Sequence, residues 1–105
     1  MKTILPKELK ERLDRGDDIV LIDVREENER EICHIGGTLI PLGEINQRFA
    51  EIPREKEVVV YCRSGGRSGK AVEFLESQQG YANVTNLTGG VLRWSDDVDA
   101  GVVKY

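Results

Sequence analysis

The segment from residue 58 to residue 79 constrains the fold of this chain more than any other part. It begins with a continuous β-branched and aromatic run, Val58-Val59-Val60-Tyr61-Cys62, which predicts a buried strand. The run passes directly into a polar, glycine-containing loop, Arg63-Ser64-Gly65-Gly66-Arg67. Apolar residues at helical spacing then predict a helix from Ser68 to about Gln79. A buried strand that leads through a short loop into a helix is typical of α/β folds.

Strands and helices alternate along the rest of the chain as well. Short apolar runs predict further strands over residues 19–24, 38–41 and 83–87. Helices are predicted over 6–15 and 42–52 and from residue 89 to about 94, while the charged stretch 25–32 indicates a short exposed helix or turn. We therefore expect an α/β fold with a mostly parallel central sheet and helices on both of its faces.

Length and charge limit the classes of function. The 105 residues fit one domain, so we expect a single domain over 1–105. The formal net charge of −4 argues against a general nucleic-acid or anionic-membrane binder, which needs a basic surface. The N-terminal apolar stretch ends at once in Pro6 and charges, and no window is long enough to span a membrane. A cytoplasmic protein is therefore expected.

The cysteine and histidine content gives no disulfide framework and no complete zinc site, although a single structural disulfide is possible. The chain has two cysteines, Cys33 and Cys62, separated by 29 positions, and one histidine, His34. These three residues cannot complete a structural zinc site without carboxylates, and no C-x-x-C pair is present. We expect no metal and no cofactor.

The loop that follows the strongest strand has the features of an anion site with a reactive thiol. Cys62 lies at the carboxyl end of that strand, where ligands bind in parallel sheets. The free N–H groups at the start of the next helix favour negative charge, and Gly65 and Gly66 can adopt the positive φ that turns N–H groups inward. Arg63 and Arg67 add positive charge at the rim. Such surroundings stabilise a thiolate, which is the nucleophilic form of cysteine.

Each of these features has an ordinary structural explanation when it stands alone. A cysteine after a strand is often a small buried hydrophobic residue, a glycine pair is often a turn, and an arginine pair often lies in solvent. Their combination, in this order and between a strand and a helix, favours the functional interpretation.

Four motifs in this order resemble those of single-domain rhodaneses, the thiosulfate sulfurtransferase family, over nearly the whole chain. They are Asp23-Val24-Arg25-Glu26, His34-Ile35, Tyr61-Cys62-Arg63-Ser64-Gly65-Gly66-Arg67-Ser68 and Leu87-Thr88-Gly89-Gly90-Val91-Leu92-Arg93-Trp94. The chain departs from the family pattern at Cys33, where a glycine is usual, and at Ile35-Gly36-Gly37-Thr38, which lacks the usual Gly-Ala step.

The resemblance implies an enzyme that moves sulfane sulfur through a persulfide on Cys62. The donor would be thiosulfate or a similar small anion, and the acceptor would be cyanide, a small thiol or a protein. The residues expected to bind the substrate are Arg63, Ser64, Gly65, Gly66, Arg67 and Ser68. Arg63 and Arg67 would bind the anionic donor.

The resemblance also suggests roles for residues outside the loop. Asp23 and Arg25 would form a partly buried pair that holds the fold together. His34 would be structural, and Trp94 would contribute packing. Cys33 could attack the Cys62 persulfide, but the sequence favours a packed or surface thiol.

Three other functions remain open at the level of sequence. A phosphatase or arsenate reductase on the same scaffold is disfavoured, because Cys-based phosphatases have five residues between the cysteine and the arginine and this chain has four between Cys62 and Arg67. A non-catalytic rhodanese-like interaction module is disfavoured by the intact loop. A redox or sulfide sensor, in which a partner reads the modification of Cys62, stays possible.

Overall fold

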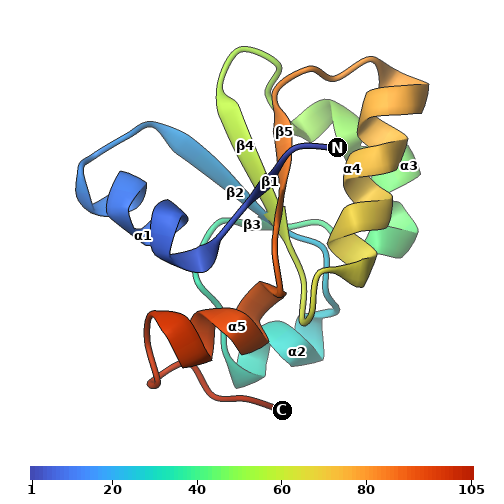
Figure 1. Cartoon of the computed structure of the whole chain (residues 1–105). Coiled ribbons are helices and arrows are strands. Elements are labelled where there is room, and N and C mark those ends of the chain that lie inside the picture. Colours follow the sequence, from blue (N-terminus) through green and yellow to red (C-terminus); the bar gives the residue numbers. More distant parts are fainter.

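Five parallel strands form one central sheet in the computed structural model, which describes all 105 residues (Figure 1). The strands are β1 Thr3–Ile4, β2 Ile19–Asp23, β3 Thr38–Leu39, β4 Glu57–Tyr61 and β5 Val84–Leu87. They lie in the order β1-β5-β4-β2-β3, and every neighbouring pair is parallel. The predicted α/β class with a parallel sheet is therefore confirmed.

Helices cover both faces of this sheet, as predicted (Figure 1). The α-helices are α1 Pro6–Asp14, α2 Glu27–Ile32, α3 Ile45–Arg48, α4 Gly66–Gln79 and α5 Gly90–Asp97, and two 3-10 helices span Leu42–Glu44 and Phe49–Glu51. In Figure 1, α3 and α4 lie on one side of the sheet and α1 on the other, while α5 and α2 lie near the end at which the strands finish. None of the helices has the length and apolarity that a membrane crossing requires.

The central strand β4 divides the hydrophobic core into two clusters. Val58 and Val60, together with Cys62 just beyond the strand, belong to the cluster that includes the buried residues of α3 and α4. Val59 and Tyr61 belong to the cluster that includes buried residues of α1 and α5. Side chains alternate between the faces of a strand, and a strand with helices on both faces is apolar on both. This is why the run in β4 is continuous rather than alternating.

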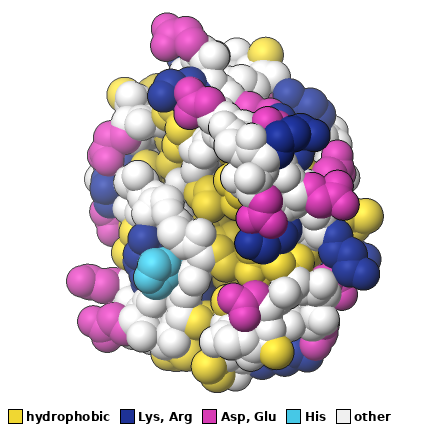
Figure 2. Space-filling model, turned by 90° about the vertical axis from the view of Figure 1, so that its left-hand side faces the viewer, with side chains coloured by type: hydrophobic (Ala, Val, Ile, Leu, Met, Phe, Trp, Pro, Cys, Tyr) yellow, Lys and Arg dark blue, Asp and Glu magenta, His cyan; other side chains and the backbone are white.

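The surface on the α1 side carries charges of both signs. Figure 2 shows acidic and basic side chains interspersed around a central apolar area on this face. The apolar residues that lie at the margin of the second cluster are only partly buried: Leu13, Ile19, Leu21, Ile35 and Val98. Apolar side chains therefore reach the surface on this face, and none of these five residues lines any of the three cavities of the structure.

Three local predictions need correction. The segment 42–52 is not one helix but a 3-10 helix, one α-helical turn and a second 3-10 helix. Pro53 follows Ile52 and disfavours helical backbone there, and Ile52 is extended, with φ −89° and ψ 121°. The short strand β1 was not predicted. The strand β4 ends at Tyr61, one residue before Cys62, and α4 begins at Gly66, two residues before Ser68.

Candidate active site

The sulfur of Cys62 lies at the centre of a set of hydrogen-bond donors supplied by the Cys62 loop, residues 62–68. The backbone N–H of Gly65 donates to Cys62 Sγ at 3.1 Å, and the backbone N–H of Ser68 donates at 3.4 Å. The Ser68 hydroxyl oxygen lies 3.3 Å from the same sulfur. Cys62 is only 1% exposed, so these contacts take place out of bulk water. The structure thus brings Cys62, Gly65 and Ser68 of the predicted site together.

The loop reaches this geometry because one glycine adopts left-handed backbone. Gly65 has φ +105°, a conformation that residues with a side chain rarely adopt, and it is the N-cap of α4. A Cβ at Gly65 would also lie 3.3 Å from the backbone nitrogen of Gly89. The expectation that Gly66 could share this role is not met, because Gly66 has no positive φ and forms the first residue of α4.

The start of α5 holds the loop from the opposite side. The N–H of Val91 donates to the carbonyl of Cys62 at 3.0 Å, and the N–H of Leu92 donates to the carbonyl of Arg63 at 3.1 Å. Gly90 has φ +56°, and a Cβ there would lie 2.4 Å from the Cys62 carbonyl oxygen. These contacts occupy loop carbonyls with α5, so that N–H groups rather than carbonyl oxygens surround the sulfur.

The net effect of these surroundings is a thiol that ionises more readily than usual. Burial on its own raises the pKa of Cys62, because it penalises the thiolate. The hydrogen bonds from Ser68 and from the N–H groups of Gly65 and Ser64 outweigh burial and lower the pKa below its ordinary value. The N-terminus of α4 has the same sign of influence. The structure therefore gives Cys62 the lowered pKa on which the predicted reactivity depends.

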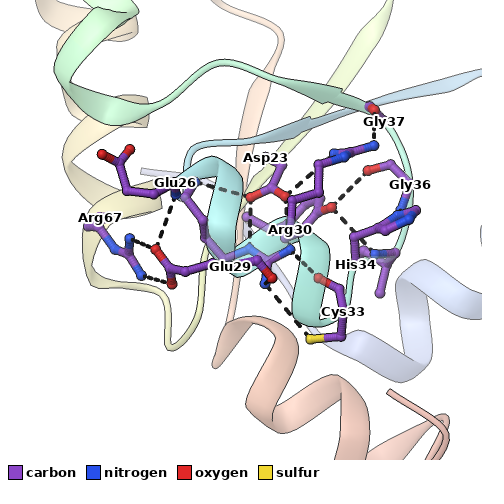
Figure 3. A network of polar contacts seen from close by, with 12 residues as sticks. Asp23, Glu26, Glu29, Arg30, Cys33, His34, Gly36, Gly37 and Arg67 are labelled. Carbon is purple, nitrogen blue, oxygen red and sulfur yellow. Dashed lines mark hydrogen bonds and ion pairs between the residues drawn. The ribbon is translucent and has the colours of Figure 1, made fainter. Parts of the chain in front are cut away.

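The guanidinium of Arg67 is occupied by a carboxylate of the protein. Its two nitrogens donate to Glu29 Oε1 at 2.6 Å and to Glu29 Oε2 at 2.8 Å (Figure 3). The Tyr105 hydroxyl donates to the same carboxylate at 2.8 Å. The pairing with Arg67 lowers the pKa of Glu29 to about 2, against the opposing effect of burial. Arg67 therefore ties the Cys62 loop to α2, and its charge is largely compensated.

Arg63 also has partners in the chain, although it remains exposed. Its guanidinium donates to the backbone carbonyl of Tyr105 and lies 5.1 Å from the centroid of the Tyr105 ring. No Asp or Glu side chain pairs with it, whereas Arg67 is paired with Glu29. Arg63 is thus the more accessible of the two cations at the rim of the Cys62 loop.

Next to the loop, Asp23 and Arg25 form a fully buried ion pair rather than the partly buried one expected. The Arg25 guanidinium donates to both oxygens of Asp23 at 2.9 Å, and neither side chain has exposed area. It also donates to the Cys33 carbonyl at 2.7 Å and to the Tyr105 hydroxyl at 2.9 Å. Asp23 and Arg25 therefore join β2, the end of α2 and the C-terminal segment.

Of the remaining predicted residues, His34 and Trp94 have the structural roles expected. The Nδ1 atom of His34 accepts the backbone N–H of Gly36 at 3.0 Å and so shapes the turn before β3 (Figure 3). Trp94 packs in the second core cluster and is 6% exposed.

The polar contacts of Cys33 are all with residues outside the Cys62 loop. Its thiol donates to the carbonyl of Val103 at 3.2 Å, and its sulfur lies 3.9 Å from an Arg25 nitrogen. Both cysteines are free, and no group of three or more His, Cys, Asp or Glu side chains is placed to hold a metal ion.

Sequence reasoning missed two residues of the site. The sequence presents Glu29 only as part of a charged stretch and Asn86 only as part of a strand. Asn86 lies at β5, where its Oδ1 faces the Ser68 hydroxyl at 2.5 Å and its Nδ2 donates to the Gly65 carbonyl at 3.2 Å. Nothing in the sequence marks either residue, because their partners lie 38 and 21 positions away.

Comparison with known proteins now defines the family. Residues 5–97 match the model of the rhodanese-like domain, and this chain belongs to that family. A protein named "Sulfurtransferase" from Allochromatium vinosum is 42% identical over 88 residues, which cover 83% of this chain and 81% of that protein. A rhodanese-like domain protein from Staphylococcus aureus has the same fold, with a TM-score of 0.84, 29% identity and coverage of 100% of this chain and 99% of that one.

The same domain also occurs within longer proteins. The chain is 37% identical over 106 residues to "Probable adenylyltransferase/sulfurtransferase MoeZ" from Mycobacterium tuberculosis. The match covers 98% of this chain but only 27% of that protein. The chain therefore spans about a quarter of this relative, whose name describes two activities.

Proposed function

We propose that this protein is a sulfurtransferase that carries sulfane sulfur as a persulfide on Cys62. The observation that carries the proposal is the convergence of donors from Gly65 and Ser68 on a buried sulfur with a lowered pKa. The names of relatives that match most of the chain support the same class of reaction.

The first half of the reaction loads the cysteine. The Cys62 thiolate attacks the outer sulfur of thiosulfate or a similar donor, and a bond forms between Sγ and that sulfur. The bond between the two sulfur atoms of the donor breaks, and sulfite leaves with the electron pair. The outer sulfur of the resulting persulfide is anionic, and the N–H groups of the Cys62 loop stabilise it as they stabilise the thiolate.

The second half of the reaction unloads the cysteine. A nucleophilic acceptor, such as cyanide, a small thiol or a cysteine of a protein, attacks the outer sulfur. The bond between Sγ and the outer sulfur breaks, and Cys62 leaves as a thiolate with the electron pair. A lowered thiol pKa makes Cys62 a better leaving group in this step, so one set of donors serves both halves. Neither step requires a metal or an organic cofactor.

We propose that Arg63 supplies the main attraction for an anionic donor, and that Arg67 contributes through the position of the loop. This division follows from the ion pair between Arg67 and Glu29, whereas Arg63 is exposed and pairs with no Asp or Glu side chain. Arg63→Ala is expected to raise the KM for thiosulfate by about tenfold or less, because a single exposed charge contributes about 1 kcal/mol. Its kcat should change little, since Arg63 does not contact Cys62 Sγ.

The decisive experiment is intact-mass measurement with peptide mapping after incubation of the reduced protein with thiosulfate and removal of excess donor. We expect the gain of one sulfur atom on the peptide that contains Cys62, in the wild type and in Cys33→Ser. Cys62→Ser should gain none and should lose transfer to cyanide. Sulfur transfer that persists in Cys62→Ser, or a folded wild type that gains no sulfur from thiosulfate or from a small-molecule persulfide, would refute the proposal.

A further inference from the structure

Asn86 connects the two elements that contact the reactive sulfur. It is 9% exposed and lies at β5, beside the Cys62 loop. Its Nδ2 lies 3.2 Å from the carbonyl oxygen of Gly65, and its Oδ1 lies 2.5 Å from the hydroxyl oxygen of Ser68. Ser68 is fully buried and contacts Cys62 Sγ at 3.3 Å. A chain of contacts thus runs from Asn86 through Ser68 to the nucleophile.

The orientation of the Asn86 amide follows from the carbonyl of Gly65. A carbonyl oxygen can only accept, so the amide must present its NH2 group to Gly65. The Oδ1 atom then faces Ser68, and since Oδ1 can only accept, the hydroxyl must be the donor. A hydroxyl has one proton. While Ser68 donates that proton to Asn86, it can only accept from Cys62, and it does so from the S–H of the neutral thiol.

Ionisation of Cys62 reverses what the sulfur needs. A thiolate has no proton to give, so the Ser68 oxygen would face it with lone pairs. To stabilise the thiolate, the hydroxyl must rotate towards Sγ and leave Oδ1 of Asn86 without a donor in a buried place. The hydroxyl of Ser68 therefore cannot serve both neighbours at once, whereas the N–H groups of Gly65 and Ser68 stay with the sulfur in either state.

We propose that Asn86 is a positioning residue. When the sulfur is neutral, Asn86 accepts the Ser68 hydroxyl proton and so directs that proton away from Cys62 Sγ. When Cys62 ionises, Asn86 competes with the thiolate for the same proton. As a thiol, Cys62 donates to Ser68, and Ser68 donates to Asn86. When Cys62 is a thiolate, the Ser68 hydroxyl donates to Sγ instead, and its hydrogen bond to Asn86 is lost.

This competition shifts the equilibrium between the free thiolate and the persulfide of Cys62, a consequence that rests on the proposed function. In the persulfide the negative charge lies on the outer sulfur, and Sγ is bonded to two heavy atoms. Ser68 can then return to Asn86 and satisfy its Oδ1. The free thiolate alone requires the hydroxyl to leave Asn86, so Asn86 disfavours the unloaded thiolate relative to the loaded persulfide.

The test measures how the rate of Cys62 alkylation by iodoacetamide depends on pH. It is a double-mutant cycle of Asn86→Ala and Ser68→Ala. All variants carry Cys33→Ser, so that Cys62 is the only cysteine. The midpoint of the rate against pH reports ionisation of Cys62, is independent of how easily the reagent enters, and requires no sulfur transfer. Asn86→Ala frees the Ser68 hydroxyl for the thiolate. We expect the midpoint to move to lower pH, with a gain of about tenfold in the thiolate fraction below it, because ionisation no longer leaves the buried Oδ1 of Asn86 without its donor, a loss that costs about 1–3 kcal/mol.

The cycle is completed in a Ser68→Ala background. There Asn86→Ala should leave the midpoint unchanged, because no hydroxyl remains to redirect. Asn83→Ala is the matched control: its amide donates to the carbonyls of Pro53 and Lys56, and its removal should leave the midpoint in place. Asn86→Asp, which keeps the size and the acceptor of the native residue and adds a negative charge, should move the midpoint to higher pH.

The results that would overturn the proposal are equally specific. A midpoint that Asn86→Ala raises or leaves unchanged would refute it, as would a lowered midpoint that persists in full in the Ser68→Ala background. If Asn86→Ala does not fold, Asn86→Asp decides, and a midpoint at or below that of the wild type would refute the proposal. Failure of the persulfide to form with thiosulfate would bear on the proposed function alone.

Discussion

Replacement of Arg25 by methionine should remove a substantial part of the stability of this domain. The side chain is fully buried and donates to both oxygens of Asp23, to the Cys33 carbonyl and to the Tyr105 hydroxyl. Methionine matches its length but not its charge or its donors. The Asp23 carboxylate would keep the Arg25 backbone N–H at 3.1 Å and a contact from Arg30 at 3.5 Å. It would otherwise be a buried charge without compensation.

The magnitude follows from this isolation. Removal of one partner from a buried ion pair costs about 3–5 kcal/mol. Small domains are stable by about 5–15 kcal/mol, so Arg25→Met should remove a substantial fraction of that stability. Asp23→Asn combined with Arg25→Met removes the uncompensated charge, and this double variant should recover most of the loss. The pairing of Asp23 with Arg25 therefore stabilises the fold, whereas either buried charge alone would destabilise it.

Urea denaturation, followed by the fluorescence of the buried Trp94, measures these differences. Arg15→Met is the control, because Arg15 pairs with Asp17 at the surface with 65% of its side chain exposed, and such pairs contribute about 1 kcal/mol or less. A loss of less than about 1 kcal/mol in Arg25→Met would refute the reasoning. A double variant less stable than Arg25→Met would refute it too.

Two further predictions concern the surroundings of the Cys62 loop. Because the ion pair with Arg67 lowers the pKa of Glu29 from 4.5 to about 2, its contribution is present above pH 4.5 and is lost as the pH falls towards 2. Acid titration of stability should therefore show a loss of up to about 3 kcal/mol in the wild type that Glu29→Gln lacks, and parallel curves would contradict this. Gly90→Ala should cost about 2–4 kcal/mol in urea denaturation, because its Cβ would lie 2.4 Å from the Cys62 carbonyl oxygen at a positive φ. Gly43→Ala, which has open space, should cost less than about 0.5 kcal/mol, and equal losses would contradict the steric argument.

The parts of the fold that were predictable from sequence are those with a strong local pattern. The run from Val58 to Tyr61 predicts the central strand because it is apolar on both faces, and Gly80 marks the end of α4 with φ +69°. The strand β1 escaped prediction because two residues, Thr3 and Ile4, carry no periodicity. They form a strand only because they pair with β5, which lies more than 80 positions further along the chain.

The candidate site divides in the same way. The nucleophile and its loop were predictable, because Cys62 and Gly65 carry their chemistry within a few positions of each other. The partner of Arg67 was not, since a charged helix contains several carboxylates and only the packing of α2 brings Glu29 to it. The contact between Asn86 and Ser68 likewise depends on the register of β5 beside the start of α4.

The donors that surround the sulfur are mainly groups of the main chain, and this affects how the site can change over evolution or in the laboratory. Gly65 and Gly90 have positive φ and close neighbours, so these positions tolerate few substitutions. Ser64 and Gly66 are exposed, and a side chain at Gly66 would meet nothing within 4 Å. A library of variants at these two positions would change the surface that an approaching donor or acceptor contacts. It would leave the hydrogen bonds to the sulfur intact. Selectivity and reactivity are thus separately adjustable in this loop.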